Sequence, residues 1–106
     1  MRVAVVSSDI FTEADLSLLD EVCLSSSYCC TAVVTFSRGL GGPWARRRRL
    51  PVVWVSTVKQ IPQEAEAVIV LWDGKSADMA ALIKVARGDG LLVYARVATP
   101  RGNAET

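Results

Sequence analysis

The chain has 106 residues, a formal net charge of +1, and a composition that is 51% hydrophobic and 22% charged. These values predict one globular domain and exclude a disordered chain. The sequence contains no histidine, which excludes His-based catalytic triads and His-ligated metal centres. We therefore expect no metal site, and we expect no cofactor.

The cysteine pattern and the apolar runs indicate where the protein resides. Cys23, Cys29 and Cys30 have no CxxC spacing, which fits a reducing compartment better than a disulfide scaffold. The apolar runs are far shorter than the roughly 20 residues that cross a bilayer. The N-terminus lacks the long apolar segment of a secretory signal. We expect a cytoplasmic protein that does not associate with membranes.

Apolar and β-branched runs predict five strands, at residues 3–6, 32–36, 51–55, 68–71 and 91–95. Thr12 offers an N-cap for a helix that ends at residues 25–27, and residues 44–50 predict a short helix after a glycine-rich loop. The clearest helical stripe combines Met79, Leu82, Ile83 and Ala86. Residues 56–66 are predicted to connect the third and fourth strands with a helical turn rather than a full helix.

This alternation predicts an α/β protein with a minimal Rossmann-like, three-layer fold. Right-handed crossovers give a five-stranded parallel sheet of order 3-2-1-4-5. We expect residues 1–98 to form the single domain and residues 99–106 to form a flexible tail. In such sheets, ligands bind beyond the carboxyl ends of the strands where the winding reverses, here between the first and fourth strands.

The residues expected at this position follow the first, second and fourth strands. Glycine amides and the helix N-terminus at Ser76 are suited to a phosphate, Lys75 supplies a cation, and Asp73 can accept from a sugar or base. An ordinary turn with Ser76 as a helix cap explains the last segment equally well. The predicted ligand-binding residues are Ser7, Ser8, Gly39, Gly41, Gly42, Trp72, Asp73, Gly74, Lys75 and Ser76.

Residues 67–76, Ala-Val-Ile-Val-Leu-Trp-Asp-Gly-Lys-Ser, precede a helical pattern and then residues 90–94, Gly-Leu-Leu-Val-Tyr. This stretch resembles the C-terminal half of SLOG-superfamily proteins, which include DNA-processing protein A and the LONELY GUY phosphoribohydrolases. The resemblance implies a Rossmann-like domain that binds a nucleotide or a nucleotide-derived small molecule. The chain departs from the pattern at Asp78-Met79, where members carry Gly-Thr, and it lacks the glycine run and the Arg/Glu motif of the phosphoribohydrolases.

Two other functions remain open. The architecture is also similar to that of nucleoside 2-deoxyribosyltransferases, which would make the protein a nucleotide N-glycosidase or transferase using a carboxylate. Asp9, Asp73 and Asp78 are the carboxylates near the predicted site, although turn and helix-start roles explain Asp73 and Asp78 as well.

Nucleic-acid binding is the second alternative. Arg46, Arg47, Arg48 and Arg49 are consecutive and could neutralise phosphates, with Trp44 and Trp54 nearby for stacking. A solvated helix end explains the arginine run too. Arg38, at the start of the glycine loop, is a separate candidate. We also expect a homodimer, since small domains with exposed tryptophan often associate.

Overall fold

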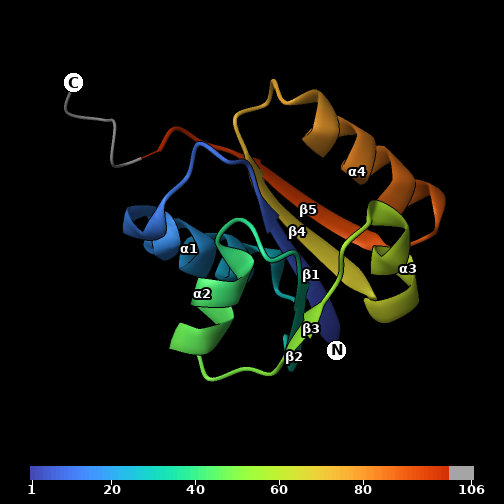
Figure 1. Cartoon of the computed structure of the whole chain (residues 1–106), viewed down its shortest axis with the longest axis horizontal. Coiled ribbons are helices and arrows are strands. Elements are labelled where there is room, and N and C mark those ends of the chain that lie inside the picture. The colour runs from blue at the N-terminus through green and yellow to red at the C-terminus, as the bar shows by residue number, and fades with distance from the viewer. Residues whose placement is uncertain (101–106) are drawn as a thin grey trace.

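The computed structural model describes residues 1–100, which form a five-stranded sheet between two layers of helices (Figure 1). All neighbouring strands are parallel and the order is β3-β2-β1-β4-β5, which confirms the predicted fold. The strands are β1 (Arg2–Ser7), β2 (Ala32–Thr35), β3 (Val52–Trp54), β4 (Ala67–Trp72) and β5 (Leu92–Val97).

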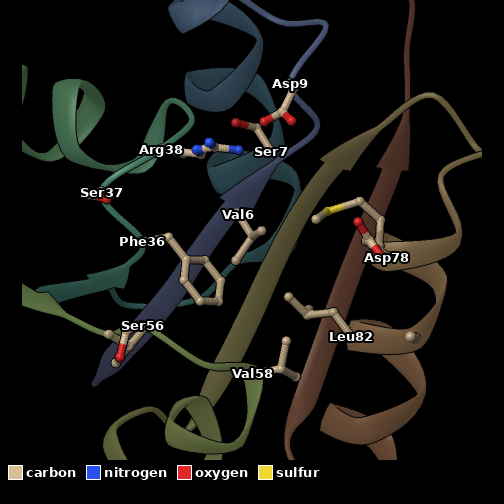
Figure 2. A pocket seen from close by; sticks show the side chains of 13 residues that line it. Val6, Ser7, Asp9, Phe36, Ser37, Arg38, Ser56, Val58, Asp78 and Leu82 are labelled. Atoms are coloured by element: carbon tan, nitrogen blue, oxygen red, sulfur yellow. The ribbon is translucent and has the colours of Figure 1, made fainter.

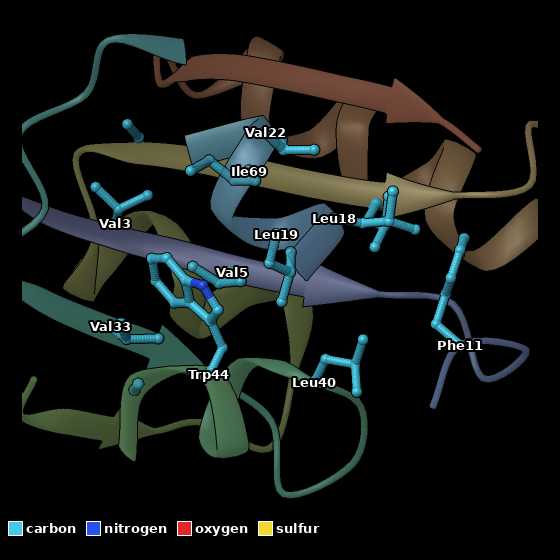
Figure 3. Close-up of a cluster of buried hydrophobic side chains, with 13 residues drawn as sticks. Val3, Val5, Phe11, Leu18, Leu19, Val22, Val33, Leu40, Trp44 and Ile69 are labelled. Atoms are coloured by element: carbon cyan, nitrogen blue, oxygen red, sulfur yellow. The ribbon is translucent and has the colours of Figure 1, made fainter. Parts of the chain in front are cut away.

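Alternation along the central strands divides the core into two layers. Val3 and Val5 of β1 belong to the cluster under α1 (Leu16–Ser26) and α2 (Gly41–Arg47), in which the Trp44 side chain is fully buried (Figure 3). Ala4 and Val6 belong to the cluster on the opposite face, under α3 (Ile61–Glu64) and α4 (Ala77–Gly88). β1 and β4 are buried on both faces because they lie at the centre of the sheet.

The connection after β3 is short, as predicted. It contains only the 3-10 turn η2 (Val58–Gln60) and the four-residue α3. The Gln60 side-chain oxygen accepts from the backbone N–H groups of Ser56 and Thr57 and thereby holds the start of this connection. Since α3 is so short, α4 is the only long helix on its face of the described sheet (Figure 1).

The start of α2 differs from the prediction. The helix begins at Gly41 rather than at Trp44, because Gly41 and Gly42 are buried in its first turn and not free in a loop. The first α1 turn is a 3-10 turn, η1 (Glu13–Asp15), in which the Asp15 carboxylate accepts from the Thr12 N–H at 2.9 Å. Of the predicted tail, Thr99 and Pro100 have no regular structure, Pro100 is buried, and residues 101–106 lie outside the described part of the chain.

Candidate functional site

A groove of about 620 Å³ opens at the carboxyl edge of the sheet, on the face covered by α3 and α4 (Figure 2). The segments that follow β1, β2 and β3 form one side, and the first two turns of α4 form the other. The short crossover after β3 leaves this space open, because a full-length helix there would pack beside α4. Its volume is within the range of small-molecule sites.

The groove has an apolar floor and a charged rim. Val6, Phe36, Val58 and Leu82 project into it from four different segments (Figure 2), with Val55, Met79 and Ala81 completing the apolar part. Polar side chains at the rim are Ser7, Asp9, Ser37, Arg38, Ser56 and Asp78. This combination suits a flat, partly apolar ligand that carries polar groups at its ends.

Three charged side chains lie around this rim, and none of them forms an ion pair or a side-chain hydrogen bond within residues 1–100. Arg38 extends from the loop after β2 toward Ser7 and Asp9, and Asp78 faces them from the first turn of α4 (Figure 2). One guanidinium and two carboxylates are therefore available to a ligand. Asp9 and Asp78, the carboxylates of the predicted enzyme alternative, line the same groove, whereas Asp73 does not.

Among the predicted ligand-binding residues, only Ser7 lines this groove. Its Oγ accepts a 2.9 Å hydrogen bond from the Leu40 N–H, which anchors the glycine loop to the end of β1. Gly39 lies against the same hydroxyl, since a Cβ at this position would be 2.9 Å from Ser7 Oγ, and its φ of +86° favours glycine. Ser7 and Gly39 thus position the loop that carries Arg38.

The turn Asp73–Ser76 is organised by its own hydrogen bonds. The Asp73 carboxylate accepts from the backbone N–H groups of Lys75 at 2.8 Å and Ser76 at 2.9 Å. These bonds, the Lys75 bond foremost, lower the pKa of Asp73 below its usual value. Ser76 Oγ caps α4 by accepting from the Met79 N–H at 3.4 Å. Gly74 has a φ of +80° and packs against Val97.

Asp73 and Lys75 line a second, smaller hollow of about 340 Å³ together with Ile10 and residues 97–100. The two halves of the predicted site therefore separate: Ser7 faces the groove, and the Asp73–Lys75 turn faces this hollow. The sequence placed both at the correct edge of the sheet but did not reveal that different cavities serve them.

Ser8 and Trp72 lie side by side at the ends of β1 and β4. The register pairs Ser7 with Leu71, and the Ser8 N–H donates to the Leu71 carbonyl at 3.0 Å. The Ser8 hydroxyl and the Trp72 indole nitrogen are both buried without a hydrogen-bond partner among the described residues. Each of the two central strands is thus followed or ended by a buried polar group without a partner, where the winding of the sheet reverses.

Gly41 and Gly42 are explained by packing. A Cβ on Gly41 would collide with the Thr35 hydroxyl and lie 2.5 Å from the Val5 carbonyl oxygen. A Cβ on Gly42 would lie 2.8 Å from the Trp54 ring. The prediction that their amides form a free glycine loop is therefore wrong, because α2 needs both glycines to approach the sheet closely.

The four consecutive arginines do not form a uniform group. Arg48 forms an ion pair with Asp20 at 3.0 Å and stacks on the Trp44 ring, 5.1 Å from its centroid. Arg46, Arg47 and Arg49 are exposed, and none of them has an ion pair or side-chain hydrogen bond in the described chain. All four follow or end α2, away from the groove.

Several groove residues were not predicted as site residues, notably Phe36, Ser56, Val58 and Leu82. The sequence predicted Phe36 as the last residue of a strand, whereas β2 ends one residue earlier, at Thr35. It predicted Leu82 as part of a helical core stripe, and Leu82 is a buried residue of α4. The available signal was the short connection after the third strand, which leaves space beside α4 on that face.

Comparison of the chain with protein-family models, with curated proteins and with solved structures gives no match. In residues 1–100, no three His, Cys, Asp or Glu side chains gather in a way that could hold a metal ion. Within the same range, every helix is too short or too polar to cross a bilayer.

Proposed function

We propose that the protein binds a nucleotide or a nucleotide-derived small molecule in the groove at the carboxyl edge of the sheet. The observation that carries this proposal is the groove itself, about 620 Å³ in volume, beside the reversal of strand order between β1 and β4. Parallel α/β sheets bind ligands at this place. The resemblance of residues 67–95 to SLOG proteins supports the same class of ligand.

The chemistry of the lining supports a specific orientation. Phe36, Val58 and Leu82 offer an apolar floor for the base, with the Phe36 ring available for stacking. Arg38 is the only cation among residues 1–100 that lines the groove, and it suits a single phosphate or carboxylate group. Asp9 and Asp78 accept from hydroxyl or amino groups of the sugar or base. A monophosphate fits this charge pattern better than a triphosphate.

The test is to fill the groove without disturbing the core. Ala81 and Ala80 are adjacent and exposed on α4, but only Ala81 lines the groove. We would screen nucleoside monophosphates, cyclic nucleotides and ADP-ribose by thermal shift and by amide NMR shifts. Any ligand found should lose at least tenfold in affinity in Ala81→Trp and keep its affinity in Ala80→Trp. Equal affinity in both variants, or no ligand in the screen, would contradict the proposal.

The Arg38→Gln variant tests the orientation. If Arg38 holds the ligand's anionic group, a monophosphate should lose about tenfold in affinity, whereas the matching nucleoside should bind both proteins equally. Lys75→Gln serves as the control because Lys75 lies at the smaller hollow. A selective loss in Lys75→Gln would instead place the phosphate at the Asp73–Ser76 turn.

Catalysis is the second candidate, and one observation favours it: two carboxylates, Asp9 and Asp78, face the same groove. Cleavage or transfer of an N-glycosidic bond requires such groups, one to attack or stabilise the sugar carbon and one to transfer a proton. Chromatography of nucleosides and nucleotides incubated with the protein would show release of free base. Turnover should disappear in Asp9→Asn or Asp78→Asn and persist in Asp73→Asn.

A further inference from the structure

The edge of the molecule formed by β3 and α2 carries an uneven charge. Residues 31–60 contain six basic side chains and no acidic one. Four of these six, Arg46, Arg47, Arg48 and Arg49, end or follow α2, which packs beside β2 (Figure 1). Arg38 lines the groove, and Lys59 belongs to η2 on the opposite face of the sheet. The arginine run is therefore the part of this charge that is concentrated at one place.

Most of the arginine run on this edge is available for a partner. Arg48 is used internally, since it forms an ion pair with Asp20 and stacks on Trp44. Arg46, Arg47 and Arg49 are exposed, and they have no ion pair or side-chain hydrogen bond within residues 1–100. Three free guanidinium groups in four consecutive residues attract a polyanion more strongly than scattered cations do.

An exposed aromatic ring packs on the first turn of the helix that leads into these arginines. Trp54, the last residue of β3, is 54% exposed, and its ring rests on the first turn of α2 at Gly42. Arg46 is four residues after Gly42, so the two positions lie above one another on the helix. Arg46 therefore lies on the side of α2 on which the Trp54 ring rests.

Glycine at position 42 allows this arrangement. Any larger residue would displace the ring, because a Cβ there would lie 2.8 Å from Trp54 Cη2. One side of the indole is thus supported by the backbone of α2, while more than half of the side chain remains in solvent. A supported, exposed ring next to free guanidinium groups can stack on a base while the guanidinium groups contact phosphates.

We infer that Trp54, Arg46, Arg47 and Arg49 form a binding surface for single-stranded nucleic acid, separate from the groove. A single strand fits better than a duplex because its unpaired bases are free to stack on Trp54. Stacking on Trp54 and contacts to phosphates do not distinguish one base from another, so we expect binding that tolerates any sequence. Because the phosphate contacts are ionic, we expect the affinity to fall as the salt concentration rises.

Fluorescence anisotropy with labelled 20-nucleotide dT and dA strands, titrated from low to physiological salt, tests this inference. The full chain should bind both strands, with affinity that falls steeply as salt rises. Replacing Arg46, Arg47 and Arg49 together by glutamine should weaken binding at least tenfold and reduce the slope of log affinity against log salt by about two, given ~0.7 per phosphate contact. The double variant Lys84→Gln/Arg87→Gln removes two cations from α4 and is the control. Its affinity for the strands should stay within twofold of the wild type, and its salt slope should be unchanged.

Trp54→Ala should weaken binding at least about fivefold, and Trp54→Phe, which keeps a ring, should recover most of that loss. Circular dichroism and thermal unfolding of each variant show whether it is folded. The phenylalanine variant keeps the test decisive if the alanine variant is not. Ala81→Trp should bind the strands normally, which separates this surface from the groove.

Four results would overturn the inference. They are an absence of binding to dT and dA at low salt, affinity that ignores the arginine substitutions, loss of binding in Ala81→Trp, and preference for duplex DNA, heparin or phosphatidylserine vesicles over single strands. The last would identify a general polyanion or membrane surface, and the third would assign the strand to the groove. Failure here leaves nucleotide binding in the groove intact, because the two tests use different variants.

Discussion

The indole Nε1 of Trp44 donates a 2.9 Å hydrogen bond to the Asp20 carboxylate, which joins α2 to α1 across the buried face of the sheet. Trp44 is fully buried, and the same carboxylate oxygen accepts from Arg48 at 3.0 Å. One acidic side chain therefore satisfies a buried donor and pairs with the cation that covers the ring. This link explains both a tryptophan and an arginine that otherwise resemble ligand-binding residues.

Asp20→Ala should lower the free energy of unfolding by about 1–2 kcal/mol, because it leaves the Trp44 indole N–H buried without an acceptor. Asp20→Asn keeps an acceptor oxygen and should cost less. Arg48→Gln removes the partly exposed ion pair and the stacking of the guanidinium on Trp44 but leaves the Trp44 hydrogen bond, so it should cost about 1 kcal/mol or less. Urea unfolding followed by tryptophan fluorescence measures all three. Equal losses in the three variants would show that the charge, and not the Trp44 bond, matters.

Gly41→Ala should destabilise the protein by about 1–3 kcal/mol or more, because the added methyl group meets the Thr35 hydroxyl and the Val5 carbonyl. Gly88→Ala is the matched control. Gly88 is the last residue of α4, a Cβ there meets nothing within 4 Å, and alanine should be neutral or stabilise by up to about 1 kcal/mol. Thermal unfolding distinguishes the two. A tolerated Gly41→Ala would mean that α2 can move away from the sheet.

Asp73 should contribute a pH-dependent part of the stability. Its pKa is lower in the folded protein than in the unfolded chain, so its contribution is present above the unfolded value, about 3.9. That contribution is lost as the pH falls through the lower folded value. Asp73→Asn should therefore be less stable than the wild type at pH 7, and the difference should shrink toward pH 3. Chemical denaturation of the wild type and of Asp73→Asn at several pH values measures this.

The three cysteines should differ in reactivity. Burial raises the pKa of the Cys23 and Cys30 thiols, which reduces their thiolate fraction at neutral pH, whereas Cys29 is exposed. Iodoacetamide at pH 7.5 should modify Cys29 first, as judged by fragment mass spectrometry. Cys29→Ser should remove the fast phase and leave the slow one. Rapid modification of Cys23 or Cys30 in the native protein would contradict the burial of these two thiols.

The topology of the sheet could be predicted from the sequence alone. Five apolar runs separated by helical patterns or short connections leave little choice of topology, because parallel strands need right-handed crossovers and β4 is apolar enough to be covered on both faces. The same reasoning predicted a ligand site at the carboxyl edge of the sheet between β1 and β4. It also predicted, correctly, that the connection before β4 contains only a short helical segment.

Which side chains line the same cavity could not be predicted from the sequence and depends on the packing of the elements. In the sequence, Gly41 and Gly42 fit a phosphate-binding loop and a close helix–sheet contact equally well. Their close approach to Thr35, Val5 and Trp54 shows that they serve the helix–sheet contact. The helical stripe places Leu82 in the core, where it is almost fully buried, yet together with the half-buried Phe36 it also lines the groove. Local pattern specifies each element, but the space between elements depends on contacts distant in sequence, which local pattern does not encode.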